Sequence, residues 1–129
     1  MIDMIKVIET AKAPKAMGPY AQGRVFNNTI YTAGQIGLDP ETMKMIEDTE
    51  AQIGQVFRNV EAIVQAGGGD LSSILKLVVY LTDLAHWPLV NAAMIDRFQA
   101  PFPVRTAVGV ADLPFGAVVE IEAVAAVKA

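Results

Sequence analysis

One segment of the chain repeats its apolar residues with a helical period. The repeat predicts an amphipathic helix that begins at Asp48 or Thr49, and Gln52 is spaced from Thr49 as in a capping box. Gly67-Gly68-Gly69 ends this helix. Because the glycines follow a helix rather than open one, we interpret them as a C-cap and turn and not as a phosphate loop. The apolar stripe consists of Ile53, Val56, Phe57, Val60, Ile63 and Val64.

A second helix is predicted over residues 83–98, with Pro88 in its first turn, where a missing amide donor costs nothing. Its apolar face would be lined by Leu84, Trp87, Val90, Met94 and Phe98.

Other segments alternate or are rich in β-branched residues, which is typical of strands. Asn27-Asn28 predicts a type I′ hairpin turn, because asparagine tolerates positive φ. The resulting order is β-β-β-α-β-α-β-β, which favours an α+β fold with one mixed sheet, some parallel pairing and two helices on one face. The predicted strands are residues 5–10, a hairpin over 25–32, and residues 74–81, 104–110 and 118–127.

The last predicted strand has two unlike faces. A period of two separates Ile121, Ala123 and Ala125 from Glu120, Glu122 and Val124. The helices would cover one face of the sheet and leave the other uncovered. A face that mixes small apolar residues with carboxylates predicts a subunit interface.

The composition fits a single domain over residues 1–129 with an apolar surplus, since 53% of residues are hydrophobic and 19% are charged. Such a surplus is often buried in an oligomer. The net charge is -4 and the cations are scattered, which argues against nucleic-acid binding. The chain has no Cys and one His, His86, so thiolate and multi-His metal sites are excluded. His86 is expected to be a surface or capping residue.

The N-terminal segment Met1–Lys6 lacks the basic start and long apolar core of a signal peptide. No apolar stretch reaches membrane-spanning length. We therefore expect a cytoplasmic location and no membrane partner.

Arg105 is the residue with the clearest chemical potential. It lies in Phe102-Pro103-Val104-Arg105, where a strand begins after a helix, and Glu120 opens the last strand. A guanidinium can hold a carboxylate through two parallel hydrogen bonds, and a nearby carboxylate can handle a water or a proton. The flanking segments lead us to expect that Arg105 and Glu120 meet.

Five motifs, in order and with near-matching spacing over almost the whole chain, resemble the RidA/YjgF family, also called the L-PSP endoribonuclease family. These motifs are Gly18–Gly23, Thr32–Ile36, Val90–Ala92, Phe102–Arg105 and Glu120–Ala123.

The resemblance implies a chorismate-mutase-like fold that assembles as a homotrimeric barrel with ligand clefts between subunits. It also implies an imine deaminase, a hydrolase that converts 2-iminobutanoate, 2-iminopropanoate and 2-aminoacrylate-type intermediates to 2-keto acids and ammonia without metal or cofactor. One alternative is a regulator that binds a keto acid or amino acid without turnover. Another is an endoribonuclease or translation inhibitor, against which the acidic composition argues.

The resemblance also implies roles for six residues. Arg105 would bind the substrate carboxylate, Glu120 would position or activate water, and Tyr20 would lie at the ligand and assist. Backbone groups of Gly34 and Ala107 would contact the ligand, with Asn91 nearby. Other roles stay open: a salt bridge for Arg105, an interface charge for Glu120, an aromatic plug for Tyr20, unusual φ for Gly34 and a helix cap for Asn91.

Three positions depart from the family pattern. Ala33 stands where many relatives have Ser, Thr106 where a smaller residue is common, and Ala107 where Cys is frequent. These changes leave the carboxylate anchor intact and leave open the substrate preference and the rate of turnover.

Overall fold

A computed structural model describes residues 4–129, so the first half of the segment Met1–Lys6 lies outside the described part. The strands are β1 Lys6–Ile8, β2 Gly23–Phe26, β3 Thr29–Thr32, β4 Ile74–Leu81, β5 Val104–Gly109 and β6 Val119–Ala126. The helices are α1 Thr49–Ala66 and α2 Trp87–Arg97, with 3₁₀ turns at Leu71–Ser73, Leu84–His86 and Pro114–Gly116.

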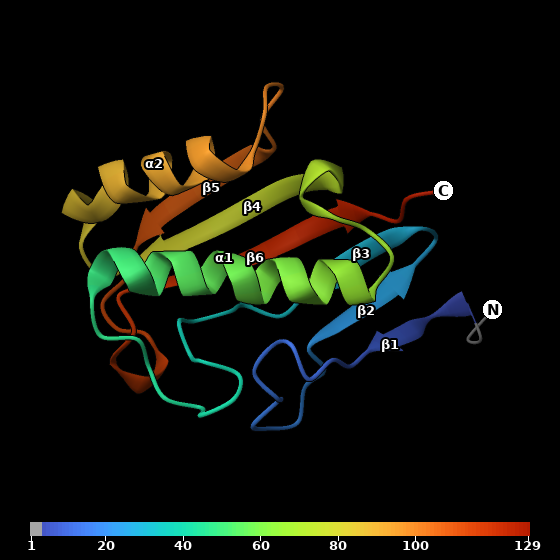
Figure 1. Cartoon of the computed structure of the whole chain (residues 1–129), viewed down its shortest axis with the longest axis horizontal. Helices are drawn as coiled ribbons and strands as arrows, with labels where there is room; N and C mark the ends of the chain where they lie inside the picture. The colour runs from blue at the N-terminus through green and yellow to red at the C-terminus, as the bar shows by residue number, and fades with distance from the viewer. Residues whose placement is uncertain (1–3) are drawn as a thin grey trace.

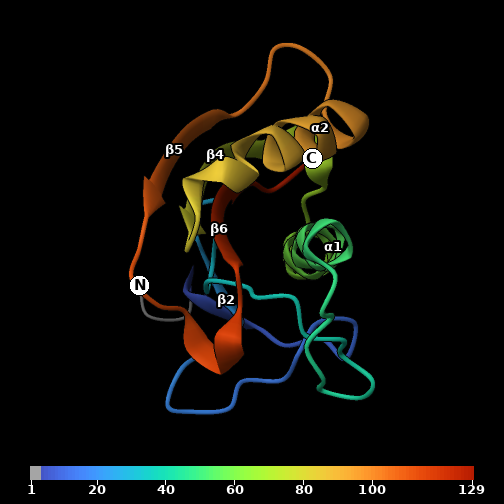
Figure 2. The same ribbon diagram turned by 90° about the vertical axis from the view of Figure 1, so that its left-hand side faces the viewer.

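The six strands form one mixed sheet in the order β1-β2-β3-β6-β4-β5 (Figure 1). β4 and β5 pair in parallel, as the strand–helix–strand connection predicts, and the other pairings are antiparallel. Both helices lie on the same side of the sheet, as Figure 2 shows. The predicted α+β architecture is confirmed.

Helix α1 begins as predicted, but the prediction of a capping box between Thr49 and Gln52 is wrong. Asp48 caps the helix by accepting a hydrogen bond from the Ala51 amide at 3.0 Å. Gln52 instead donates to the Ile46 carbonyl at 2.8 Å and accepts from the Val118 amide at 2.7 Å. Because Gln52 is buried, its amide satisfies backbone groups of two loops rather than its own helix end.

The turn between β2 and β3 confirms the hairpin prediction. Asn27 has a φ of 51° and Asn28 a φ of 63°, which are the two left-handed residues of a type I′ turn. A turn of this type matches the twist of the strands and fixes their register.

The predicted helix over residues 83–98 is divided into a 3₁₀ turn and α2. Pro88 lies in the first turn of α2, and Val90, Met94 and Phe98 are buried, as predicted. Leu84 was expected on the same face but is 55% exposed. It lies in the 3₁₀ turn, whose three residues per turn take it out of line with the α-helical stripe.

The sheet face away from the helices is here called the open face. No other part of residues 4–129 covers it. On β6, Ile121, Ala123 and Ala125 are buried against the helices, whereas Glu120, Glu122 and Val124 are half-buried on the open face, as predicted. The strand registers add several apolar and polar residues to this face: Val7, Arg24, Tyr31, Val78, Tyr80, Val104, Thr106 and Val108.

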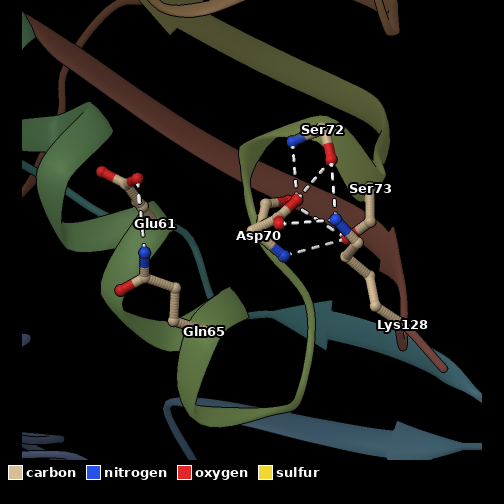
Figure 3. Close-up of polar contacts among 6 residues, drawn as sticks. All are labelled: Glu61, Gln65, Asp70, Ser72, Ser73 and Lys128. Atoms are coloured by element: carbon tan, nitrogen blue, oxygen red, sulfur yellow. Dashed lines mark hydrogen bonds and ion pairs between the residues drawn. The ribbon is translucent and has the colours of Figure 1, made fainter.

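A polar cluster ties the C-terminal segment to the turn before β4 (Figure 3). The Asp70 carboxylate accepts hydrogen bonds from the Ser72 amide and hydroxyl at 2.9 and 2.6 Å and from Lys128 Nζ at 2.8 Å. The Lys128 ammonium, together with Ser72, lowers the pKa of Asp70 to about 2.

No helix within residues 4–129 is both long and apolar enough to span a membrane.

Lys128→Ala is expected to raise the pKa of Asp70 toward its ordinary value, without reaching it, because both bonds from Ser72 remain. An NMR titration of the Asp70 carboxyl group measures this shift. A pKa lowered by folding stabilises the native state above the unfolded pKa, and this contribution disappears as pH falls through about 2. Lys12→Ala, which removes another exposed ammonium, should leave the Asp70 titration unchanged; an equal shift in both variants would contradict the pairing.

Candidate functional site

Arg105 and Glu120 lie on opposite faces of the sheet. Arg105 is in register with Leu77 of β4, which is fully buried under the helices. Glu120 is in register with Tyr80 of β4, on the open face. Residues three apart on a strand point to opposite faces, so the expectation that Arg105 and Glu120 meet is wrong within one chain.

The first group of predicted residues forms what we call the arginine half-site, made of Arg105, Asn91 and Ala107 with Trp87 and Met94. Arg105 Nη1 donates to Asn91 Oδ1 at 2.6 Å and contacts Met94 Sδ at 3.3 Å. The guanidinium carbon lies 4.4 Å from the centre of the Trp87 ring. Ala107 is two residues along β5, so it shares the face of Arg105 and packs against the core.

These contacts fix the guanidinium and leave donors available. Both side-chain bonds use Nη1, so the remaining N–H groups of Arg105 can face a ligand. Beside them is a hollow of about 430 Å³ whose lining includes Ile95 and Phe102. These two side chains are 68% and 49% exposed, which leaves an apolar rim around a cation. This arrangement suits a carboxylate attached to an apolar group.

The second group forms what we call the glutamate half-site, made of Glu120, Gly34 and Tyr20. All three line one hollow of about 310 Å³. The Glu120 carboxylate lies directly against Gly34: a Cβ there would collide with Oε2 and lie 2.9 Å from Cδ. Gly34 therefore makes room for the carboxylate, a role that the sequence analysis did not assign. The Tyr20 hydroxyl accepts a hydrogen bond from the Met17 amide at 3.2 Å, which holds the ring at the hollow.

The surroundings of Glu120 make its carboxyl group harder to ionise than a carboxyl group in water. Burial, and secondarily the charge of Glu122, raise the pKa of Glu120 above its ordinary value. Glu122 Oε1 in turn accepts a hydrogen bond from the Tyr80 hydroxyl at 2.5 Å, and this bond raises the pKa of Tyr80. A carboxylate with a raised pKa is a stronger base once ionised, so Glu120 is suited to accept a proton from water.

Sequence reasoning did not assign Trp87, Met94 or Glu122 to the site. Trp87, Asn91 and Met94 have the spacing i, i+4, i+7, which places them on one helix face, and this signal could have grouped them. Glu122 was placed on the Glu120 face but was given no role. Within residues 4–129, no three His, Asp or Glu side chains cluster as metal ligands, and His86 belongs to neither half-site.

Known proteins resemble this chain over almost its whole length. The family model described as endoribonuclease L-PSP matches residues 10–127. The 2-iminobutanoate/2-iminopropanoate deaminase of Salmonella typhimurium is 43% identical over 125 residues, which cover 95% of this chain and 98% of that protein.

Solved structures are similar over the same extent. The crystal structure of RidA from the Antarctic bacterium Psychrobacter sp. superimposes with a TM-score of 0.92 at 45% identity, covering 95% of this chain and 99% of that one. The structure of E. coli TdcF with bound serine has a TM-score of 0.90 at 39% identity, with the same coverage of both chains.

Proposed function

This chain belongs to the endoribonuclease L-PSP family, which is the RidA/YjgF family, and from that membership we propose that its two half-sites act together on a 2-imino acid. Its activity is that of its curated relatives: it is a 2-iminobutanoate/2-iminopropanoate deaminase, a hydrolase that acts on a C–N bond. The roles of individual residues, the assembly and a cytoplasmic location are parts of the proposal.

The observation that carries the proposal is the division of the predicted residues between two faces. One half-site offers a fixed guanidinium and the other a half-buried carboxylate, and neither alone provides both. A second copy can bring its arginine half-site to the glutamate half-site of the first. The uncovered open face and the exposed apolar rim of Ile95 and Phe102 supply surface for such a contact.

We expect a homotrimer in which each pair of neighbouring subunits forms one cleft. A closed ring of this kind repeats one heterologous contact three times and leaves no unpaired half-site. Light scattering should give about three times the 13.8 kDa mass of one chain at micromolar concentration. A stable monomer under these conditions would contradict the shared cleft.

The chemistry follows from the groups that the two half-sites supply. Arg105, oriented by Asn91 and Trp87, holds the carboxylate of the imino acid and so fixes the position of its C2 carbon. Glu120 takes a proton from a water whose oxygen bonds to C2. The C=N π electrons move to nitrogen, which takes up the proton held by Glu120. A second proton then passes from the new C2 hydroxyl group to nitrogen, and the C–N bond breaks as the C=O bond forms, which releases ammonia and the 2-keto acid. Tyr20 lies where it can close the hollow or assist the proton transfer.

The backbone groups of Gly34 and Ala107 are both proposed to contact the ligand, but the two residues lie in different surroundings. Gly34 makes room for the Glu120 carboxylate, and its backbone borders the same hollow. Ala107 follows Arg105 on the helix side of β5 and brings no polar side chain to the ligand. The absence of hydroxyl and thiol groups at Ala33 and Ala107 leaves recognition to Arg105 and to backbone groups.

The decisive assay mixes the protein with 2-aminoacrylate or 2-iminopropanoate generated during the measurement. A deaminase accelerates pyruvate release over the uncatalysed rate. The alternative of a binding regulator is favoured by one observation, the serine bound to E. coli TdcF. Tight binding of a keto acid or amino acid without faster pyruvate release would support that alternative.

Glu122→Gln is expected to move the acidic limb of the pH–rate profile to lower pH. Hydrolysis needs ionised Glu120, so the rate rises as pH increases through the pKa of Glu120, which burial and Glu122 raise. Removing the Glu122 charge lowers that pKa, while burial keeps it above the ordinary value. The measurement is kcat/KM as a function of pH. Glu47→Gln changes an exposed carboxylate elsewhere and should leave the pH–rate profile unchanged. If the acidic limb does not move in Glu122→Gln, the titration of Glu120 is not its cause.

A further inference from the structure

Phe115 combines two unfavourable features. It lies in the Pro114–Gly116 turn between β5 and β6 with φ 58° and ψ 25°, a left-handed conformation that a bulky side chain rarely adopts. Its side chain is also 65% exposed. Strained residues of this kind persist where the surrounding structure imposes them, and they concentrate at functional sites.

The turn places Phe115 on the wall of the glutamate half-site. The hollow of about 310 Å³ that contains Glu120 and Tyr20 is bounded on its apolar side by Met17, Ile36, Leu38, Pro114 and Phe115. Ile36 and Leu38 belong to a small buried cluster with Ala117, so this wall is anchored from behind. Phe115 is the largest side chain on this wall and, at 65% against 46%, is more exposed than Met17.

We infer that Phe115 selects the side chain of the 2-imino acid and makes this enzyme favour apolar side chains larger than a methyl group. The inference rests on the proposed function, since it takes the substrate carboxylate to be held at Arg105 and C2 to lie at Glu120. The methyl group of 2-iminopropanoate would leave the apolar wall in contact with water. A branched aliphatic side chain would cover Phe115 and Met17 and gain the free energy of that burial.

The same hollow disfavours an acidic side chain. A second carboxylate on the substrate would lose water against the apolar wall and lie near the charge of Glu120. Lys15 also lines the hollow, but it is exposed and borders the neighbouring hollow as well, so its ammonium stays hydrated. The expected order of kcat/KM is leucine-derived imine, then alanine-derived imine, then glutamate-derived imine.

Phe115→Gly is the sharpest test, because glycine adopts the left-handed backbone without strain and so keeps the turn while removing the ring. Imines of alanine, leucine and glutamate are generated in the assay, and kcat/KM is measured for each. The ratio of the leucine-derived to the alanine-derived imine should fall about tenfold in Phe115→Gly, the scale on which a hydrophobic pocket discriminates. Phe26→Ala removes an exposed aromatic ring that lines neither hollow, and it should leave the ratio unchanged.

Three outcomes overturn the inference and leave the deaminase activity in place. An unchanged ratio in Phe115→Gly, or a wild-type preference for the glutamate-derived imine, shows that the ring does not select the side chain. An equal loss for all three imines with a weakened trimer assigns Phe115 to the subunit contact. If wild-type protein accelerates none of the imines, the proposed function fails instead, so the two failures are distinguishable.

Discussion

Glu120→Gln is expected to slow imine hydrolysis about a hundred- to ten-thousandfold, the usual cost of losing a positioned general base. Glutamine has nearly the same shape and still fits against Gly34, but it cannot take the proton of the attacking water. Because Arg105 holds the substrate carboxylate, pyruvate should bind this variant about as well as it binds the wild type. The loss should therefore appear in kcat, which single-substrate kinetics and a pyruvate titration measure together.

Glu122→Gln is the matched control for this prediction. It makes the same chemical change two residues away, on the same strand and the same face, and leaves Glu120 in place. At neutral pH it should keep most of the rate. If Glu120 is an interface charge rather than a base, Glu120→Gln will shift the melting temperature of the trimer and leave the rate as it was.

The parts of the fold that local sequence determines were predicted well. The two asparagines at 27 and 28 adopt the left-handed conformations that a type I′ turn needs, and Asp48 caps α1. The predictions that failed depend on distant partners. Gln52 leaves its own helix end because the backbone of Ile46 and Val118 needs its amide. Nothing within one helical turn of Gln52 encodes those two loops.

The separation of Arg105 from Glu120 has a similar origin. Alternation fixes which residues of a strand share a face, but it does not say which face meets the helices. On β6 the contrast between Ile121 and Glu120 decides this, whereas β5 has no such contrast, since Val104 and Val108 are apolar and exposed. The register of β5 with β4 places Arg105 under α2, and that register becomes visible only in three dimensions.

Arg105→Lys is expected to reduce kcat/KM about ten- to a hundredfold, the scale of one lost charged hydrogen bond. Lysine keeps the charge but loses the planar fork, and with it the stacking on Trp87 and the orienting bond to Asn91. Binding of pyruvate should weaken along with catalysis, unlike the pattern for Glu120→Gln. Arg58→Lys, a matched change on the exposed side of α1, should be silent. Wild-type kinetics in Arg105→Lys would make the arginine a structural residue.

The two variants together test whether the cleft is shared. If each cleft combines Arg105 of one subunit with Glu120 of its neighbour, subunits of Arg105→Lys and Glu120→Gln that are unfolded, mixed equally and refolded will rebuild intact clefts. Random assortment in a closed ring gives about one intact cleft in four, so the mixture should recover about a quarter of wild-type activity. Refolded alone, Arg105→Lys should keep at most about a tenth of wild-type activity and Glu120→Gln at most about a hundredth. A cleft built within one chain would leave every subunit defective, and mixing would restore nothing.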